Sequence, residues 1–553
     1  MANTNRRLEG GDALVETLAR LGVKSLFSIS GGPINSAYFA TTRNDVRIVH
    51  VRHEAAGTFM AESVYRATGT PGAVLATLGP GVANTASAAA CAMLAGVPMI
   101  IVGGQASTAA LNRGAGMEMD TMSIMAPVTK WSAQVLHADR IPEIIDEAYR
   151  RMMAGTPGPV YVEIPTDVLS AEITDAVSPR SPYIPASMAA PDARSVEQTR
   201  ELIEKAQRPL LVAGDGVYHN RAEGLLQEFV SRTGIPSGTL RLARGALDET
   251  SNENWYGPAY IPCNPVLAAA LEEADLVLLL GHHWEFDLEF GESIGPDTQV
   301  IQVHRDAAFL GRNGRADLQI HADVGPFLDA LQDCGADAMD RDWKERLPRD
   351  WRAGQDRLTA VSEQPSEGDP RPHPLQVIDA IVEAAPEDAR FITSHGNVDF
   401  WADPRVEVRR PASYLRSGQS GALGAELPFA VGSALERPDA PSILFVGDGA
   451  IGYHLAELET AARFNSPVIV VVLDDNSWGA IAMPQRMGYD VEVALELPPR
   501  DWVSMAKGLG AAGYSVALQD VGRTLKEAVA DGGPAIIHVA VRSELSPYMA
   551  HIS

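Results

Sequence analysis

Two acidic residues near the C-terminal end, Asp448 and Asp475, each stand where an apolar run ends. The interval 450–474 spans 25 residues, long enough for the helix predicted over 453–464 and a second buried strand over 467–473. Two buried strands joined by a helix form a parallel pair, so both acids are predicted at carboxyl ends of neighbouring strands. That edge is where open α/β sheets bind their ligands.

The same two carboxylates indicate what the ligand is. Mg²⁺ takes a few oxygen ligands from protein carboxylates and shares the rest of its shell with phosphate oxygens. Two acids at one edge of a sheet therefore predict a hard cation that holds a diphosphate group.

Gly-Asp-Gly occurs twice in the chain, and the two copies can be compared. Gly214-Asp215-Gly216 also follows a predicted strand, but the matching downstream position is Arg241-Leu242, which offers no metal ligand. Asp and Gly suit tight turns, so the motif alone indicates a turn. The copy at 447–449 is assigned a function because an acidic pair follows it.

The whole chain alternates buried strands with helices. Apolar runs such as 72–77, 209–213 and 535–541 lie between helical patterns, which predicts parallel strands covered by helices on both faces. At 553 residues the chain exceeds the roughly 250–300 residues over which one core keeps growing. We therefore expect an α/β protein with three doubly wound parallel-sheet domains.

Composition marks the boundaries of these domains. The segment 178–192 is rich in Pro, Ser and Ala, and the segment 340–373 is polar, so both are predicted to be connectors. The predicted domains are 1–180, 193–340 and 371–553.

The net charge argues against polyanionic partners. Lys and Arg number 45 and Asp and Glu number 71, which gives −26. A field of this sign repels nucleic acid and anionic membrane surfaces, so neither is expected as a partner. Residues 1–9 are not followed by the apolar segment of a leader, and no stretch approaches about 18 uninterrupted apolar residues. A cytoplasmic protein that acts on a small molecule is expected.

Around Asp448 the chain resembles the binding motif of thiamine diphosphate (ThDP)-dependent enzymes, in which Gly-Asp-Gly is followed downstream by Asn-Asn. Arg52-His53-Glu54 resembles the Arg-His-Glu segment of that family, and Gly79-Pro80-Gly81 with Asn84 resembles its Gly-Pro-Gly turn. The likeness covers essentially the whole chain in the right order. It implies a pyrimidine-binding domain, a central Rossmann-like domain and a diphosphate-binding domain.

The resemblance implies ligands for Mg²⁺ and ThDP. The metal ligands would be Asp448, Asp475 and the backbone carbonyl of Ser477, with Asn476 as a competing ligand. Family members usually have Asn at the position of Asp475, so this chain adds a negative charge beside the diphosphate. The cofactor-binding residues that the resemblance implies, besides Asp448, are Gly79, Asn84, Gly447, Gly449, Ala450, Asn476, Ser477, Trp478 and Gly479.

Two residues are implied in the chemistry itself. A Glu at the position of Glu54 hydrogen-bonds the aminopyrimidine ring of ThDP in the family and helps the cofactor act as its own base. Leu423, in Gly421-Ala422-Leu423-Gly424, stands at the position of the bulky apolar residue that bends the cofactor. Glu54 and Leu423 are therefore the predicted catalytic residues.

Substrate-facing residues are predicted from their position near these motifs. Gly32 and Pro33 belong to the loop after the first predicted strand, and Ala480 follows the metal loop as it does in benzaldehyde lyases. The polar candidates for substrate contact or proton relay are Gln105, Glu118 and His395.

The resemblance also concerns the central domain and the assembly. That domain holds FAD in acetolactate synthases and ADP or CoA in oxalyl-CoA decarboxylases, so a nucleotide is a candidate ligand. However, His282-His283 replace the usual Ala-Arg there, which weakens the case for FAD. In the family the positions of Glu54 and Asp448 approach one cofactor from different subunits, which implies a homodimer or a homotetramer.

The expected activity is ThDP- and Mg²⁺-dependent formation or cleavage of a carbon–carbon bond in a 2-keto acid or 2-hydroxy carbonyl compound. Carboligation as in acetolactate synthases is the leading prediction, because the first domain matches that group broadly. Cleavage as in benzaldehyde lyases or 2-hydroxyacyl-CoA lyases is the alternative, supported by Trp478-Gly479-Ala480 and by the central domain. A catalytically silent ThDP-binding homologue is a third hypothesis, motivated by Asp475 and by the lack of a polar side chain at Gly116.

Overall fold

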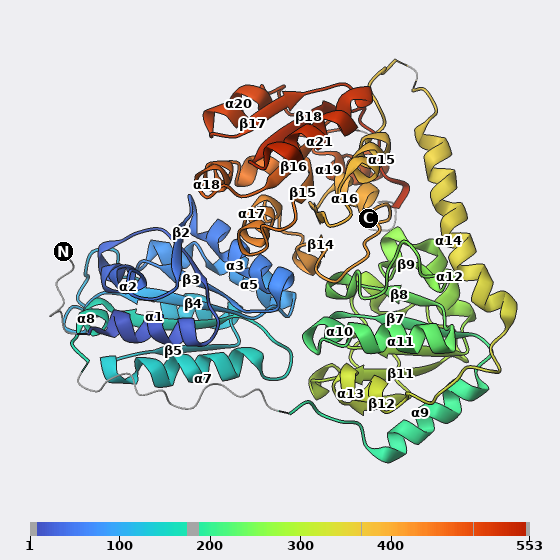
Figure 1. Ribbon diagram of the computed structural model, residues 1–553, viewed down its shortest axis with the longest axis horizontal. Coiled ribbons are helices and arrows are strands. Elements are labelled where there is room, and N and C mark those ends of the chain that lie inside the picture. Colours follow the sequence, from blue (N-terminus) through green and yellow to red (C-terminus); the bar gives the residue numbers. More distant parts are fainter. Residues whose placement is uncertain (1–7, 174–186, 367, 490, 549–553) are drawn as a thin grey trace.

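A computed structural model of the protein describes residues 8–173, 187–366, 368–489 and 491–548. Within these ranges eighteen strands form three six-stranded sheets, and neighbouring strands pair in parallel throughout. Figure 1 shows the three units in blue, green and orange to red. The predicted α/β fold with three doubly wound parallel sheets is confirmed. Part of the predicted connector at 178–192, residues 178–186, lies outside the described residues.

The first sheet has the strand order β2-β1-β3-β4-β6-β5. Its strands are β1 (Ser25–Ser28), β2 (Arg47–His50), β3 (Gly72–Ala76), β4 (Met99–Gln105), β5 (Trp131–Gln134) and β6 (Val160–Pro165). Its helices are α1 (Gly10–Arg20), η1 (Gly32–Ile34), α2 (Asn35–Thr41), α3 (Glu54–Thr68), α4 (Pro80–Ala83), α5 (Ala86–Leu94), α6 (Thr121–Met125), η2 (Ala126–Val128), η3 (Ala138–Arg140), α7 (Ile141–Met153) and α8 (Thr166–Ser170).

The second sheet has the strand order β12-β11-β10-β7-β8-β9. Its strands are β7 (Pro209–Ala213), β8 (Ser237–Thr239), β9 (Trp255–Pro258), β10 (Leu276–Leu280), β11 (Gln299–His304) and β12 (Leu318–His321). The helices of this part are α9 (Ala193–Lys205), α10 (Asp215–His219), α11 (Glu223–Thr233), η4 (Arg241–Ala243), η5 (Ile261–Cys263), α12 (Pro265–Glu273), η6 (Phe286–Gly291), η7 (Ala307–Phe309), α13 (Val324–Asp329) and α14 (Arg341–Ser362).

The third sheet has the strand order β14-β13-β15-β16-β18-β17. Its strands are β13 (Arg390–Thr393), β14 (Tyr414–Leu415), β15 (Ser442–Gly447), β16 (Val468–Asp474), β17 (Ala512–Ser515) and β18 (Ala535–Ala540). Its helices are α15 (Pro374–Ala384), α16 (Asn397–Ala402), η8 (Gly418–Ser420), α17 (Glu426–Glu436), η9 (Ala450–Tyr453), α18 (Glu457–Arg463), α19 (Gly479–Gly488), α20 (Trp502–Gly508), η10 (Leu518–Asp520) and α21 (Val521–Asp531).

Each sheet is buried on both faces, which explains the continuous apolar runs of its central strands. Because successive side chains of a strand point to opposite faces, alternate residues enter different cores. In β15, Ile443 and Phe445 belong to one buried cluster, whereas Leu444 and Val446 belong to another. The strands therefore read as uninterrupted hydrophobic segments.

The prediction that 340–373 is only a connector is wrong for most of its length. Residues Arg341–Ser362 form the long helix α14, drawn in yellow along one edge in Figure 1. Trp343, Leu347 and Trp351 recur every four residues and are all about 2% exposed. This stripe packs on the second unit, where the Trp343 Nε1 donates to the Pro209 carbonyl at 2.8 Å. The polar residues that suggested a connector occupy the other face of an amphipathic helix.

The first and third units share a hydrophobic core. Helix α3 packs against α17, and the rings of Phe59 and Phe429 meet edge to face at 6.1 Å. The Glu457 Oε1 atom also accepts the backbone N–H groups of Arg52 and His53 at 2.9 and 3.1 Å. The start of α3 is thus held by both units.

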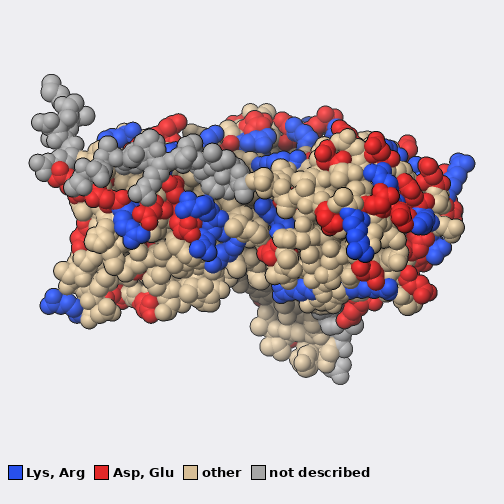
Figure 2. Space-filling view, turned by 90° about the horizontal axis from the view of Figure 1, so that it is seen from below, with Lys and Arg blue, Asp and Glu red and all other residues tan. Residues whose placement is uncertain are grey.

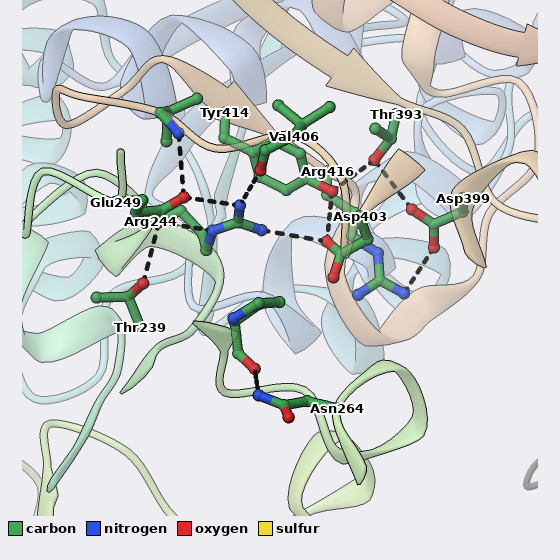
Figure 3. A network of polar contacts seen from close by, with 12 residues as sticks. Thr239, Arg244, Glu249, Asn264, Thr393, Asp399, Asp403, Val406, Tyr414 and Arg416 are labelled. Carbon is green, nitrogen blue, oxygen red and sulfur yellow. Dashed lines mark hydrogen bonds and ion pairs between the residues drawn. The ribbon is translucent and has the colours of Figure 1, made fainter. Parts of the chain in front are cut away.

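The second and third units meet through buried polar groups (Figure 3). The Arg244 guanidinium donates to both carboxylate oxygens of Glu249, at 2.7 and 2.8 Å, and lies 3.5 Å from Asp403. Tyr414 donates to the same Asp403, and Arg416 pairs with Asp399 at 2.8 Å. The polar contacts therefore run from the second sheet to α16.

On the face shown in Figure 2, Lys and Arg side chains are interspersed with Asp and Glu side chains and do not form one patch. Over the described part of the chain, no helix combines the length and the apolar character needed to cross a membrane.

Candidate active site

Asp448 and Asp475 face one cavity. Strands β15 and β16 are neighbours, with Gly447 opposite Leu473, so Asp448 and the loop from Asp475 emerge side by side. Asp448 and Asp475 both line a cavity of about 280 Å³ at this edge of the third sheet. The predicted residues that line the same cavity are His395, Leu423, Gly447, Gly449, Ala450, Ser477, Trp478, Gly479 and Ala480.

The two acids of the Asp474-Asp475 pair have different surroundings. The Asp474 Oδ2 atom accepts the Trp502 indole N–H at 2.6 Å. Its Oδ1 atom accepts the backbone and side-chain N–H groups of Asn476 at 3.0 and 2.8 Å. Asp475 instead lines the cavity, and its Oδ1 atom accepts the Ser477 backbone N–H at 3.2 Å. The side chain of Asn476 is thus engaged by Asp474, and Asn476 is not among the residues that line the cavity.

The carboxylates of this cavity are only partly compensated by positive charge, since the one ion pair that Asp448 makes within the described residues is with Arg500 at 3.5 Å. Burial, followed by the negative charges of Asp474 and Asp475, raises the pKa of Asp448 to about 7. Burial also raises the pKa of Asp475. Over the described residues, no group of three or more His, Cys, Asp and Glu side chains is placed to bind a metal. Asp448, Asp475 and Ser477 all line the cavity, and oxygen donors of this kind suit a cation that takes its other ligands from a diphosphate.

Glycines shape the walls of the cavity. A Cβ atom on Gly449 would lie 2.6 Å from the ring of Trp478, so the indole packs there only against glycine. Gly424 has φ +85°, and a Cβ atom on it would lie 2.3 Å from the Cβ atom of Tyr453. These close approaches fix the loop that carries Leu423, which lines the cavity and is partly buried.

Glu54 belongs to a separate cluster of polar residues on the first unit. It is the first residue of α3 and is 9% exposed. At the residue before it, the His53 Nδ1 atom accepts the Ala55 backbone N–H at 3.1 Å. The Asn84 side chain donates to the Glu54 Oε2 atom at 3.0 Å. A Cβ atom on Gly81 would lie 3.4 Å from the Glu54 Oε1 atom. The structure therefore brings Glu54 and Asn84 together, but Glu54 is not among the residues that line the Asp448 cavity.

Gly79, also predicted to bind cofactor, makes a tight backbone contact. It adopts φ +59°, and a Cβ atom on it would lie 1.9 Å from the Met117 carbonyl oxygen. The segment around Met117 therefore closes on the turn that precedes Asn84. Met117 and Met119 are nonetheless 57% and 38% exposed, which leaves apolar surface beside this turn.

Gln105 and Glu118, the polar substrate candidates of the first unit, are engaged in hydrogen bonds within that unit. The buried Gln105 side chain donates to the Glu163 Oε2 atom and to the Met119 carbonyl, both at 3.1 Å. The Glu118 carboxylate accepts the backbone N–H groups of Asn112 and Ala115, and these bonds lower the pKa of Glu118. Gly32 and Pro33 form η1 directly after β1, and a Cβ atom on Gly104, next to Gln105, would lie 3.5 Å from the Pro33 side chain.

His395 and Ala480 are placed differently from those candidates. Both line the Asp448 cavity, and burial lowers the pKa of His395 to about 3, so its imidazole is neutral at physiological pH. The His395 Nε2 atom is buried with no hydrogen-bond partner among the described residues. It is therefore a polar atom available to a bound molecule.

Sequence reasoning missed several residues of the site. Asn397, Val398, Ile481 and Val541 also line the cavity. The Asn397 side chain donates to the Glu544 carbonyl at 2.7 Å and accepts the Ser546 backbone N–H at 2.9 Å. A sequence signal for Asn397 is the Gly396-Asn397 dipeptide shortly after β13, where Gly396 adopts φ +117°.

The central unit has a smaller cavity at the strand ends of its own sheet. It measures about 80 Å³ and is lined by Arg241, His282, His283 and His304 among others. Arg241 is held by Glu285 at 2.6 Å, by Asp287 at 2.7 Å and by Asp215 at 3.8 Å. Burial lowers the pKa of His283 to about 2 and that of His304 to about 4. The cavity therefore offers the neutral imidazoles of His283 and His304, the Arg241 guanidinium that three carboxylates neutralise, and Arg305, which pairs with Asp323 at 3.4 Å.

Three family models match the chain in sequence order. They are described as the N-terminal TPP binding domain, the central domain and the C-terminal TPP binding domain of thiamine pyrophosphate enzymes. The matched residues are 8–124, 196–331 and 394–539.

Curated proteins are similar over nearly the full length. An acetolactate synthase of Mycobacterium bovis is 31% identical, with 92% of this chain and 84% of that protein covered. The 2-hydroxyacyl-CoA lyase 2 of Homo sapiens is 28% identical, with 96% and 90% covered. The large subunit of acetolactate synthase isozyme 1 of Escherichia coli is 28% identical, with 99% and 96% covered.

Proposed function

The chain belongs to the family of thiamine diphosphate-dependent enzymes, and on this basis we propose that it binds ThDP with Mg²⁺ and forms or cleaves a carbon–carbon bond beside a carbonyl carbon. The observation that carries the proposal is the convergence of Asp448 and Asp475 on one cavity from adjacent strand ends. Thiamine pyrophosphate is another name for ThDP, so the three matched domains and the cavity point to the same cofactor.

We assign the metal to the acidic end of the cavity. Asp448, Asp475 and the Ser477 carbonyl would hold Mg²⁺, and the backbone of Gly447, Gly449 and Ala450 would face the diphosphate. Two observations support this assignment: the oxygen donors that line the cavity, and the raised pKa of Asp448, which means that burial and the neighbouring acids outweigh Arg500. The domain division 1–180, 193–340 and 371–553 is kept as part of the proposal, since each six-stranded sheet falls within one of these ranges, and α14 then belongs with the second domain on which it packs.

When bound, ThDP supplies an electron sink for the carbon whose bond is broken or formed. Glu54 would hold a proton at its Oε1 atom against the aminopyrimidine ring, while the Asn84 amide keeps the Oε2 atom in place. Leu423 would support the cofactor from one side. The apolar side chains of Val398, Trp478 and Ile481 would exclude water from the reacting carbon.

Glu54→Gln tests the catalytic part of the proposal. The amide keeps the shape of the side chain but cannot exchange a proton, so turnover should fall about 100-fold or more while ThDP still binds. Turnover, calorimetric ThDP binding and circular dichroism should be measured together, with the exposed-surface variant Glu345→Gln as the control. Normal turnover of Glu54→Gln would sink the assignment.

The names of the relatives favour two candidate reactions for this chain. We propose carboligation of a 2-keto acid as the leading activity, because the relatives named acetolactate synthase include one at 31% identity. Cleavage of a 2-hydroxyacyl-CoA is the second candidate, because proteins of that name match over 96% of this chain. Product analysis with pyruvate, with benzoin and with a 2-hydroxyacyl-CoA separates the candidates.

A ThDP-binding protein without turnover is tested by proton exchange. The C2 proton of bound ThDP exchanges with deuterium quickly only if the protein activates the cofactor, which NMR detects after quenching. Fast exchange in the wild type that is slowed in Glu54→Gln supports an enzyme. Exchange no faster than that of free ThDP would instead identify a silent binder.

We further propose that one complete site needs two copies of the chain. Glu54 does not line the cavity of Asp448, and the exposed Met117 and Met119 lie near the Glu54 turn. Co-expressed Glu54→Gln and Asp448→Asn chains, each inactive alone, should then recover activity. Random pairing leaves one intact site in half of the dimers, or roughly a quarter of the wild-type activity. No recovery in purified mixed dimers would place both residues in one subunit.

The central cavity does not fit the nucleotide that the family resemblance allowed. At about 80 Å³ it is small, Arg241 is already neutralised by three carboxylates, and Arg305 pairs with Asp323. A diphosphate needs free positive charge or free N–H groups. We therefore assign no nucleotide to the function, and a mass spectrum of the purified protein that contained FAD, ADP or CoA would contradict this.

A further inference from the structure

Three carboxylates gather where β15 and β16 end. Asp474 is satisfied by Trp502, Asn476 and His538, the last at 3.3 Å. Asp448 and Asp475 remain to face the cavity. This site therefore places two carboxylates around a ligand that is itself an anion.

The positively charged Arg500 lies next to Asp448. The Arg500 Nη1 atom lies 3.5 Å from the Asp448 Oδ2 atom, and the two side chains are 28% and 1% exposed. Arg500 comes from the segment before α20, so neither of the two motif loops supplies it. The partial exposure leaves other N–H groups of the guanidinium accessible.

Buried residues support the side chain of Arg500. Its guanidinium carbon lies 5.7 Å from the ring centre of Trp502, which is 2% exposed. The Trp502 N–H in turn donates to Asp474 at 2.6 Å. Asp474 thus holds the indole, the indole supports Arg500, and Arg500 reaches Asp448. A surface arginine without such support would sample many rotamers at an entropic cost.

We propose that Arg500 is a binding residue for the metal–diphosphate unit, because it adds positive charge to a site that holds both Asp448 and Asp475. The inference rests on the proposed function. A guanidinium suits this place because its fork of N–H donors matches phosphate oxygens and keeps its charge at all physiological pH values. Toward bare Mg²⁺ the same charge is repulsive, so the benefit of Arg500 belongs to the diphosphate-bound state.

The test is a double-mutant cycle with Arg500→Ala and Asp475→Asn. ThDP is titrated calorimetrically into the purified full-length protein at saturating Mg²⁺. Arg500→Ala should weaken ThDP binding about tenfold in the wild-type background and about threefold or less in the Asp475→Asn background. Arg500→Lys should recover part of the loss, because it returns the charge without the fork. Arg523→Ala, on the exposed face of α21, is the matched control and should leave binding unchanged.

A second readout separates this role from a structural one. Stabilisation by Mg²⁺ alone, followed as the shift in Tm without ThDP, should not be smaller in Arg500→Ala than in the wild type. Arg500→Gln repeats the test with most of the stem over Trp502 retained. Unchanged ThDP affinity in both variants overturns the inference, and so does an equal loss in both backgrounds. A wild-type protein that binds no ThDP overturns the proposed function itself.

Discussion

At the scale of single residues, the two Gly-Asp-Gly turns show what a motif means only with its neighbours. Asp215 and Asp448 both follow a buried strand and precede a glycine. The Asp215 Oδ1 atom accepts the Leu242 backbone N–H at 3.1 Å and its carboxylate lies 3.8 Å from Arg241. The downstream interval thus reaches the same place in both units, but it delivers an arginine to Asp215 and a second carboxylate to Asp448.

This contrast predicts opposite outcomes for matched substitutions. Asp448→Asn should weaken Mg²⁺-dependent ThDP binding by at least tenfold, about 1.4 kcal/mol, because a charged oxygen ligand is lost. Asp215→Asn should leave ThDP binding unchanged and lower stability slightly, since it touches only structural partners. Calorimetric titration and thermal unfolding of both variants check this. Equal effects on binding would contradict the assignment.

Glu426 should make stability depend on pH. It is 1% exposed, its Oε1 atom accepts the His395 backbone N–H at 3.2 Å, and its Oε2 atom has no partner among the described residues. Burial is the main cause that raises the pKa of Glu426 from 4.5 to about 8, with a further contribution from Asp399. The folded state therefore keeps a proton that the unfolded state has lost between these two pH values.

The sign of the effect follows from proton linkage. Glu426 should lower the free energy of unfolding as pH rises from 4.5 to about 8. The expected fall is on the order of 1 kcal/mol for each pH unit. Glu426→Gln should remove this part of the slope, because the amide does not titrate. Urea unfolding of both proteins at intervals from pH 5 to pH 9 measures the difference. Parallel stability curves would show that Glu426 is ionised throughout.

At the scale of elements, the contact between α3 and α17 positions Glu54. Glycine allows the two helix backbones to come close at Gly432, where a Cβ atom would lie 2.5 Å from the Ser63 Oγ atom and 2.7 Å from the Met60 carbonyl oxygen. These distances are too short for any larger residue unless the helices separate. The start of α3, and with it Glu54, depends on this packing.

Gly432→Ala should therefore destabilise the protein by about 1–3 kcal/mol, the usual cost of overpacking. Gly224→Ala is the matched control, because Gly224 is also in a helix and a Cβ atom there meets nothing within 4 Å. The control should be neutral or slightly stabilising, since alanine has the higher helix propensity. Thermal unfolding distinguishes the two, and a stable Gly432→Ala protein would mean that the helices can move apart freely.

At the scale of the whole molecule, buried charges join the second and third units. The network in Figure 3 links Arg244 and Glu249 to Asp403, Tyr414 and Arg416, and it ends at Asp399 in α16. The residues that precede Asp399, from His395 to Val398, line the cavity of Asp448. The orientation of the central unit and the wall of the site are thus parts of one polar assembly.

Arg244→Ala should lower stability by about 3–5 kcal/mol, because it leaves Glu249 and Asp403 buried without a cation. The exposed Arg341→Ala, which removes only a surface pair with Glu345, should change stability by less than about 1 kcal/mol. Urea unfolding at neutral pH provides both values. Similar values for the two variants would show that the network adjusts to the loss.

The central strands could be predicted from the sequence, whereas the strands at the sheet edges could not. The run at 209–213 matches β7 residue for residue and the run at 72–77 matches β3 to within one residue, because both faces of these strands are buried. The edge strands β2, β5 and β17 were missed, since they are short and only partly buried. Their pairing comes from the neighbouring strand more than from their own composition.

The pattern of apolar runs and acids was sufficient for the fold class and for the pairing of Asp448 with Asp475, because parallel strands in register bring their carboxyl ends to one edge. Folding in three dimensions decided the rest. It turned Asp474 toward Trp502 and Asp475 toward the cavity, bound Gln105 to Glu163 of β6 and Glu118 to the backbone of its own loop, and set Arg500 beside Asp448. These outcomes depend on side-chain partners that are remote in sequence, and local patterns carry no information about such partners.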